Sequence, residues 1–240
     1  VAQWYGMFVP RGTPAAAVIM KAGPRDAIVL EVSSYQLEDS SFIRPRTACV
    51  LNITPDHLDH HGTMADYIKA KTKVFRDQTS SDACVFNADD ARCRRAAAAC
   101  GSEVLFFSSS KKGGALNAWG QAGRLVLRYK GRRHTFKPPA LPGAHNLENA
   151  MCAALMALTR GVSPADIQKT FSAFKGVEHR IEPVGTVRGL NFINDSKATN
   201  VESTLVALKA LGGDRRNIWL ILGGLDKGSP YGPLSPYLKR

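Results

Sequence analysis

Short apolar runs alternate with helical patterns along most of this chain, and that alternation limits the folds it can adopt. Residues 26–30 and 48–51 are apolar runs of the kind found in strands buried on both faces of a sheet. Helical signals occur at 63–77, at 146–159 and from Ser163 to Phe174. Strands that alternate with helices are typical of an α/β protein with a mostly parallel sheet.

The same alternation begins again after Gly176, which predicts a domain boundary there. Further segments are predicted as strands at 181–187, 190–193 and 217–222 and as a helix at 201–211. We therefore expect residues 1–176 to form one domain and residues 177–240 to form part of a second one. The chain begins at Val1 rather than at a methionine, which favours a fragment of a longer protein.

The positive charge is concentrated in one segment. The formal net charge is +12, and residues 92–137 contain eleven Lys or Arg against the single acid Glu103. The segment has strand signals at 104–107, 125–129 and 134–136, few aromatic residues between the charges and no nucleic-acid-binding motif. A solvated basic surface is the favoured interpretation, and a nucleic-acid-binding module is the alternative.

The cysteines and the hydropathy pattern indicate in which cellular compartment the protein is found. The five cysteines are odd in number and form no Cys-x-x-Cys motif, which favours reduced thiols over disulfides or a zinc site. No apolar run approaches the ~18 residues that a membrane span needs, and no signal peptide pattern is present. These features predict a cytoplasmic protein without membrane contacts.

A polar cluster at 194–200 lies between a predicted strand and a predicted helix. Such a junction borders the ligand crevice in parallel α/β sheets, where mixed charges and hydroxyls can bind an anionic substrate. Helix capping by Thr199 or Asn200 is the simpler interpretation. It accounts for one residue and leaves Asp195 and Lys197 unexplained.

Carboxylate and imidazole side chains follow the first two apolar runs. Glu31 ends the first run and His57 follows the second, so both are candidates for one crevice and for a Mg²⁺ site. Glu31 could instead cap the following turn. Residues 56–61 contain three histidines and two aspartates without the spacing of a zinc motif, and we interpret His60 and His61 as ordinary surface or core histidines.

Lys71 interrupts an apolar helical stripe formed by Met64, Ile68 and Phe75. A lysine in that place can lose its proton and become a nucleophile or react with CO₂ to give a carbamate. Its ammonium can also reach water while the stem packs on the stripe. Helix geometry alone favours this second interpretation.

Three further positions could bind anions or a nucleotide. Asn146 and Asn149 follow a turn at a helix start, where the first is a candidate N-cap and both amides could read a purine edge. Arg180 follows the predicted boundary and could bind phosphates between domains. Lys227 lies beside a Gly-Gly turn, but no Gly-x-x-x-x-Gly-Lys-Ser/Thr sequence occurs in the chain.

In their order along the chain, these motifs resemble the Mur ligases of peptidoglycan synthesis. The matching stretches are Glu31-Val-Ser-Ser-Tyr-Gln-Leu-Glu38, Asn52-Ile-Thr-Pro-Asp-His-Leu-Asp59, Tyr67-Ile-Lys-Ala-Lys71, Gly143-Ala-His-Asn-Leu-Glu-Asn149, His179-Arg180, Asn194 to Asn200 and Gly223-Gly-Leu-Asp-Lys227. The form Asp-Ser-Lys-Ala-Thr-Asn is typical of the members that add D-glutamate. A sister ligase that adds another amino acid is the alternative within the family.

The resemblance implies a central ATPase domain of mostly parallel α/β type, followed by a truncated Rossmann-like α/β domain. It also implies an ATP- and Mg²⁺-dependent amide ligase, expected to be monomeric, that joins D-glutamate to UDP-N-acetylmuramoyl-L-alanine through an acyl phosphate. The implied roles are Mg²⁺ ligands for Glu31, His57 and a carbamylated Lys71, ATP contacts for Asn149, Arg180 and Asp195, reacting-group contacts for Lys197, Thr199 and Lys227, and UDP-sugar contacts for Ser33 and Ser34. For Lys71 this role replaces the interpretation that geometry alone favoured.

The chain also departs from the family pattern. The family's P-loop and UDP-binding domain would precede Val1, and the later part of its third domain would follow Arg240. Residues 6–14 replace a Gly-Asn-Ile-Gly-Thr-Pro-like loop, so that substrate contact is in question. We therefore expect this chain to be inactive by itself.

Overall fold

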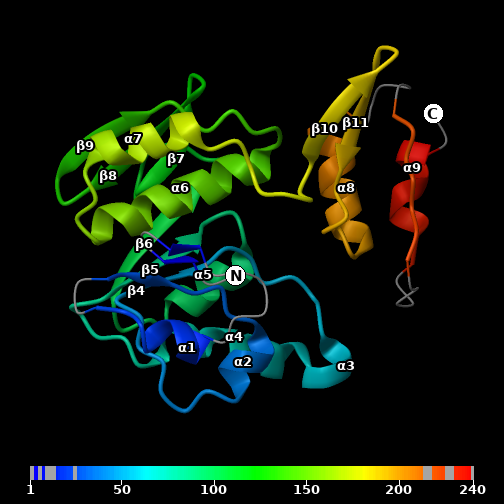
Figure 1. Cartoon of the computed structure of the whole chain (residues 1–240). Coiled ribbons are helices and arrows are strands. Elements are labelled where there is room, and N and C mark those ends of the chain that lie inside the picture. The colour runs from blue at the N-terminus through cyan, green and yellow to red at the C-terminus, as the bar shows by residue number, and fades with distance from the viewer. Residues whose placement is uncertain are drawn as a thin grey trace.

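A six-stranded sheet is the centre of the molecule (Figure 1). The computed structural model describes residues 3–4, 7–8, 15–23, 26–212, 218–224 and 230–238. The strands lie in the order β4-β5-β6-β7-β8-β9, with β4 to β7 parallel and β7 to β9 antiparallel. Their bounds are β4 Thr47–Val50, β5 Ala83–Asn87, β6 Glu103–Ser108, β7 Ala118–Gln121, β8 Arg124–Tyr129 and β9 Arg132–Phe136. The predicted α/β class is confirmed.

Helices cover both faces of this sheet. The first face carries α6 (Ala144–Thr159) and α7 (Pro164–Ala173), and the second carries α4 (Met64–Arg76) and α5 (Ala91–Ala97). In β5, Val85 joins the first core and Phe86 the second, because successive side chains of a strand point to opposite faces. All residues of β5 are buried, so this strand is the centre of the fold. It was not among the predicted strands.

Local capping signals determine where α4 and α7 begin. The hydroxyl of Thr63 accepts a hydrogen bond from the backbone N–H of Asp66 at 3.1 Å, which satisfies one of the free donors in the first turn of α4. Ser163 caps α7 in the same way, with Pro164 in its first turn. Both helix starts agree with the sequence-based predictions.

The start of α6 corrects a prediction. The N-cap is Gly143, so the helix begins at Ala144 and Asn146 lies inside its first turn. The Asn146 amide donates back to the carbonyl of Pro142 at 2.6 Å. Gly143 has a φ of +94°, and this left-handed conformation lets the chain enter the helix earlier than an asparagine cap would.

The N-terminal elements do not join the main sheet. They are β1 Gln3–Trp4, β2 Met7–Phe8, α1 Ala15–Ile19, β3 Ile28–Val29, α2 Ser34–Glu38 and α3 Leu58–His61. β3 pairs antiparallel with β1 in a separate three-stranded sheet. Ile28, Val29 and Leu30 are 36%, 47% and 41% exposed, so the prediction of a buried strand at 26–30 was wrong. An apolar run is buried only where other elements pack on it, and no described element covers this one.

The last part of the chain contains a hairpin followed by helices. Its elements are β10 Glu182–Val187, β11 Leu190–Asn194, α8 Val201–Ala210, η1 Gly232–Leu234 and α9 Ser235–Leu238. β10 and β11 are antiparallel, so the 194–200 junction does not follow a parallel strand as expected. Residues 218–222 of the predicted strand 217–222 are described and form no strand, and Trp219 and Ile221 are 91% and 93% exposed. The domain boundary near Gly176 remains a prediction.

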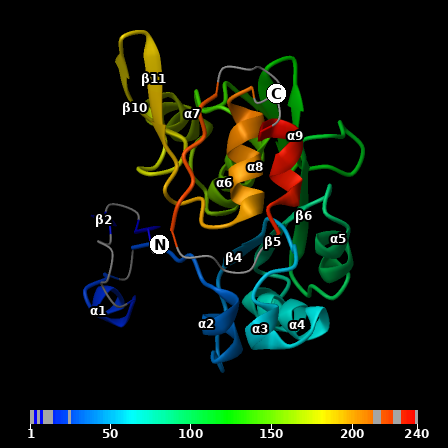
Figure 2. The ribbon, with the colours of Figure 1, turned by 90° about the vertical axis from the view of Figure 1, so that its right-hand side faces the viewer.

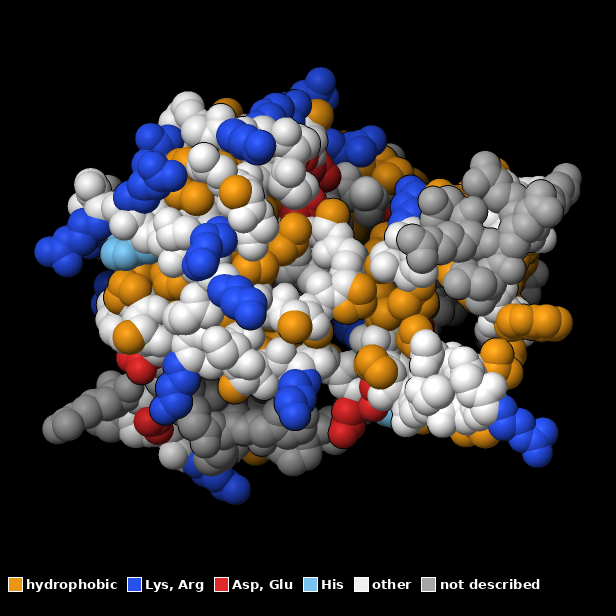
Figure 3. Space-filling model, turned by 90° about the horizontal axis from the view of Figure 1, so that it is seen from above, with side chains coloured by type: hydrophobic (Ala, Val, Ile, Leu, Met, Phe, Trp, Pro, Cys, Tyr) orange, Lys and Arg blue, Asp and Glu red, His pale blue; other side chains and the backbone are white. Residues whose placement is uncertain are grey.

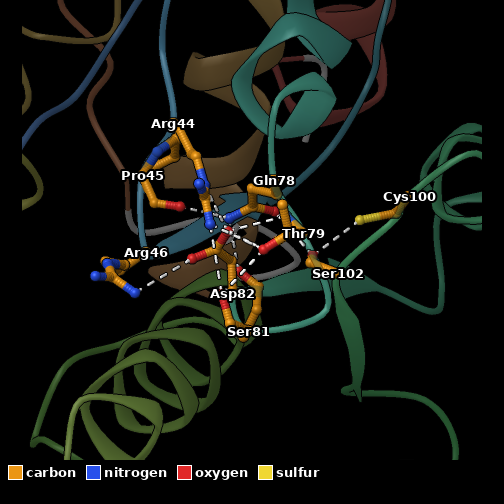
Figure 4. A network of polar contacts seen from close by, with 10 residues as sticks. Arg44, Pro45, Arg46, Gln78, Thr79, Ser81, Asp82, Cys100 and Ser102 are labelled. Atoms are coloured by element: carbon orange, nitrogen blue, oxygen red, sulfur yellow. Dashed lines mark hydrogen bonds and ion pairs between the residues drawn. The ribbon is translucent and has the colours of Figure 1, made fainter.

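A polar network holds the amino-terminal ends of β4, β5 and β6 together (Figure 4). Asp82, directly before β5, has a fully buried side chain and accepts a hydrogen bond from Nε of Arg44 at 2.9 Å. It also accepts one from the backbone N–H of Thr79 at 2.9 Å. The amide of Gln78 donates to the carbonyls of Pro45 and Ala83. This edge of the sheet is stabilised by structural polar contacts.

The basic segment at 92–137 lies on the surface. All eleven of its Lys and Arg residues are exposed. Arg128 packs on the Trp119 ring at 4.9 Å, and Arg92 donates to the carbonyl of Ile53. On the face seen in Figure 3, the basic side chains are separated by hydrophobic and neutral ones. The segment is thus exposed, as expected, and its role as a solvated basic surface stays a prediction.

Candidate functional site

The polar side chains at the opposite, carboxyl-terminal edge of the sheet form two groups. The first surrounds α2, α3 and α4, which lie side by side in Figure 2. The second joins the amino-terminal end of α6 to the 194–200 junction. Both groups come from segments far apart in the sequence.

Tyr35 in α2 is the centre of the first group. Its hydroxyl lies 3.3 Å from Nδ1 of His57, and its ring contacts the rings of His57, His60 and His61. His57 precedes α3 with φ 53° and ψ 31°, a left-handed conformation that directs its half-exposed side chain toward Tyr35. Glu31 is exposed and lies just before Ser33, the N-cap of α2.

Lys71 lies on the inward side of α4 and is half-buried. Its Nζ lies 5.1 Å from the centre of the Tyr67 ring, and Tyr67 is buried one turn earlier on the same helix. Tyr67 contacts His61, which contacts Tyr35 and so leads to His57. A continuous series of side-chain contacts therefore connects Lys71 with His57. Lys69 is exposed on the other side of the helix.

The two serines predicted to contact substrate take part in local structure. Ser33 accepts a hydrogen bond from the backbone of Gln36, whose side chain accepts one from the backbone of Ser33, and this capping box fixes the start of α2. Ser34 is buried, and its hydroxyl lies 2.9 Å from Nε2 of His61. Their role toward a substrate stays a prediction.

In the second group, the 194–200 junction is tied to residues 179–181. The carboxylate of Asp195 accepts a hydrogen bond from the backbone N–H of Ile181 at 3.1 Å. The backbone N–H of Lys197 donates to the carbonyl of His179 at 3.1 Å. Arg180 is exposed, and it lies in the chain between His179 and Ile181, whose backbone groups make these two bonds. The structure thus brings together two of the residues predicted to bind the nucleotide, Arg180 and Asp195.

The end of the junction is a helix cap. Asn200 accepts a hydrogen bond from the backbone N–H of Ser203 at 2.8 Å and is the N-cap of α8. Of the two capping candidates, Asn200 therefore takes this role. Thr199 is exposed beside it. Lys227 lies outside the described residues.

The amino-terminal end of α6 has backbone donors without a side-chain cap. Gly143 offers no side-chain acceptor to the first N–H groups of this 16-residue helix. Such an end carries partial positive charge and binds anions. Asn149 is exposed two turns into the helix. Burial lowers the pKa of the neighbouring His145, which favours its neutral form although Glu148 and Asp195 partly oppose the shift.

Electrostatic interactions link the two groups. Hydrogen bonding is the largest cause that lowers the pKa of the Glu31 carboxyl, and the positive charges of Arg180 and Lys197 lower it further. The charges of Arg180 and Asp195 both act on His145. Glu31, the start of α6 and the 179–197 region therefore share one electrostatic environment.

Sequence reasoning missed a serine-rich loop beside this site. Burial alone would raise the pKa of Asp89, but hydrogen bonds from Ser110, Ser108 and Ser109 lower it to about 2. Ser109 also donates to the Glu148 carboxylate at 2.5 Å, one residue before Asn149. The run of three serines after the strand signal at 104–107 was the available signal.

Comparisons with known proteins agree with this architecture. The family model described as the Mur ligase middle domain matches residues 10–157. The UDP-N-acetylmuramoylalanine–D-glutamate ligase of Elusimicrobium minutum (strain Pei191) is 48% identical over 234 residues, covering 95% of this chain and 50% of that protein. The ligase of the same name from Bacillus subtilis (strain 168) is 39% identical over 229 residues, covering 95% and 49%. The chain thus spans about half the length of these curated relatives.

A solved structure shows the same fold. MurF from Acinetobacter baumannii superposes with a TM-score of 0.56 at 24% sequence identity, over 70% of this chain and 37% of that one. In the part of the chain that the structure describes, every helix is too short or too polar to cross a membrane. The matched family model covers more than half of the residues, and the chain belongs to the Mur ligase family.

Proposed function

We propose that this chain is part of an ATP-dependent amide ligase that adds D-glutamate to UDP-N-acetylmuramoyl-L-alanine in peptidoglycan precursor synthesis. Relatives 39–48% identical carry the name of that ligase. The observation that carries the proposal is the convergence of Arg180, Asp195 and Lys197 with Glu31 and the start of α6. Two cationic side chains and an uncapped helix end suit the binding and transfer of a phosphoryl group.

For the nucleotide, we assign contacts to Asn149, Arg180 and Asp195. The guanidinium of Arg180 can bind phosphate oxygens through two parallel hydrogen bonds. Asp195 is held in place by its bond to the Ile181 backbone, which leaves its second carboxylate oxygen for a ligand. The free N–H groups at the start of α6 add positive potential on the same side.

For Mg²⁺, we assign Glu31, His57 and Lys71. Glu31 and His57 offer exposed oxygen and nitrogen donors, and a carbamate on the half-buried Lys71 would supply anionic oxygens, the ligand type that Mg²⁺ prefers. The contacts through Tyr35, His61 and Tyr67 connect His57 with Lys71 on neighbouring elements, and the donor types of the three residues suit the ion. When bound, Mg²⁺ would neutralise charge on the phosphates.

For the reacting groups, we assign Lys197, Thr199 and Lys227. A substrate carboxylate oxygen forms a bond to the γ-phosphorus while the bond from that phosphorus to the ADP oxygen breaks. The amine of D-glutamate then bonds to the acyl carbon, loses a proton, and phosphate leaves. The ammonium of Lys197 would stabilise negative charge in both steps, and Ser33 and Ser34 lie at the proposed UDP-sugar side.

The amino-acid specificity is tested with a protein that contains this chain and the remaining length of its relatives. Phosphate release from ATP should require UDP-N-acetylmuramoyl-L-alanine and D-glutamate, and L-alanine, L-lysine or meso-diaminopimelate should not replace D-glutamate. Arg180→Ala should raise the KM for ATP at least about tenfold. Arg188→Ala, an exposed arginine in the β10–β11 turn, should leave it unchanged. Phosphate release that requires another amino acid in place of D-glutamate would instead assign the activity of a sister ligase.

The remaining parts of the proposal are tested with the isolated chain. We infer a monomeric, cytoplasmic protein, in keeping with five free cysteines. Turnover by the isolated 240 residues would overturn the inference that this chain needs the rest of the protein. Salt-dependent retardation of nucleic acid at moderate ionic strength would support the alternative of a basic binding module at 92–137.

A further inference from the structure

Three side chains beside the proposed Mg²⁺ residues form a cluster that the proposed ligase reaction does not use. Glu38 at the end of α2 meets His60 and His61 at the end of α3, and one ligand atom from each lies within 4.8 Å of the other two. Nε2 of His60 lies 2.7 Å from Oε2 of Glu38, and Nδ1 of His61 lies 3.5 Å from the same oxygen. His60 lies on the surface and His61 in the core, as the sequence predicts, and the fold brings both to the same carboxylate.

His61 has an unsatisfied ring nitrogen inside this cluster. Its side chain is fully buried, and Nε2 is engaged with the hydroxyl of Ser34 at 2.9 Å. Nδ1 is buried and makes no hydrogen bond with any described residue, although it faces the Glu38 carboxylate. A buried polar atom without a hydrogen bond is unfavourable, so its retention needs an explanation. A cation between Nδ1 and the carboxylate would supply the missing partner.

The chemistry of the three donors selects the cation. Two imidazole nitrogens and one carboxylate oxygen are the His₂Glu set that binds Zn²⁺ and leaves its fourth position open. Metal–ligand bonds of about 2.0–2.1 Å in tetrahedral geometry separate neighbouring ligand atoms by roughly 3.3 Å. The separation of 3.5 Å between His61 and Glu38 is close to this value, and the 2.7 Å contact of exposed His60 needs only a small side-chain rotation.

We propose that Glu38, His60 and His61 form a Zn²⁺-binding site distinct from the residues assigned to Mg²⁺. Mg²⁺ prefers octahedral oxygen ligands and is a poor match for two imidazoles. A bound Zn²⁺ would link the end of α2 to α3, the helix that begins directly after His57. Zinc binding at this site would therefore help to fix the position of His57.

Zn²⁺ alone is the probe for this proposal, and isothermal titration calorimetry of the 240-residue chain is the measurement. One Zn²⁺ should bind per chain in the presence of excess Mg²⁺, and Co²⁺ in its place should give visible absorption of a tetrahedral nitrogen and oxygen site. His60→Gln and Glu38→Gln should each weaken binding at least about tenfold, since each removes a ligand. Both side chains are half-exposed, so these variants should keep the fold.

Matched controls separate this site from other metal donors. His134→Gln, in β9, should bind Zn²⁺ as the unchanged chain does. Cys100→Ser tests the half-buried thiol whose hydrogen bond with Cys84 lowers its pKa to about 6, and it should also leave binding unchanged. Binding that survives His60→Gln, or that disappears in Cys100→Ser, would overturn the proposal. Failure of the unchanged chain to bind Zn²⁺ would do the same.

Discussion

Removing the buried carboxylate of Asp82 should destabilise the fold far more than removing an exposed carboxylate that is also paired with arginine. Asp82→Ala removes three hydrogen bonds to Oδ2, from Arg44 at 2.9 Å and from the backbone and hydroxyl of Thr79 at 2.9 and 3.2 Å. Asp77 provides the comparison, since it pairs with Arg76 at 2.9 Å with both side chains partly exposed.

The expected loss in the free energy of unfolding depends on which polar groups each substitution leaves without a hydrogen bond. Arg44 is 48% exposed and can return to water, so loss of its bond to Asp82 contributes about 1 kcal/mol. The backbone N–H and hydroxyl of Thr79, an exposed residue, lose their bonds to the buried carboxylate, which adds about 1–2 kcal/mol. Asp82→Ala should therefore lower the free energy of unfolding by about 2–3 kcal/mol, and Asp77→Ala should lower it much less.

Urea unfolding followed by tryptophan fluorescence provides the assay, because Trp119 is buried in the same sheet. The backbone N–H of Thr79, followed by the Arg44 side chain, holds the pKa of Asp82 below its usual value. The stabilisation by the Asp82 carboxylate is thus complete above its pKa in the unfolded chain, which is near 3.9. It is lost as the pH falls through the lower pKa that this carboxyl has in the folded chain. Equal losses for Asp82→Ala and Asp77→Ala at pH 7, or a difference that persists in strong acid, would refute this reasoning.

Three further predictions concern the candidate site. Asp89→Asn should reduce stability by about 1–2 kcal/mol at pH 7 through weakened bonds to residues 108–110. In acid titration this difference should vanish between about pH 4 and 2, because a lowered carboxyl pKa stabilises only above that range. Asn200→Ala should cost about 1 kcal/mol in thermal unfolding by removing the cap of α8. In the longer ligase, Lys71→Ala should slow phosphate release at least about 100-fold, while Lys69→Ala on the exposed side of α4 should have little effect.

Helices with local capping signals could be predicted from the sequence. Thr63, Ser163 and Asn200 each accept a hydrogen bond from a backbone N–H within the next three residues, so a short window contains the whole interaction. The α6 start was displaced because Gly143 adopts a backbone conformation that sequence periodicity does not report.

Strand burial and the site contacts depend on residues distant in sequence. The run at 26–30 is as apolar as many buried strands, yet its exposure is set by what packs against it. His60 and His61 of α3 meet Glu38 from 22 and 23 positions away, and no local pattern encodes that approach. The sequence motifs identified Arg180 and Asp195 individually, but the bond between Asp195 and the Ile181 backbone required the fold.

The left-handed backbone of His57 also limits how this position can change during protein engineering. Residues other than glycine, asparagine and aspartate are disfavoured at a φ of 53°, by roughly 1–2 kcal/mol. A library at this position therefore selects for backbone conformation and for the proposed Mg²⁺-binding chemistry together. Asparagine and aspartate satisfy the first requirement and offer oxygen in place of nitrogen, so they are the substitutions through which a different metal preference could be reached without rebuilding the loop.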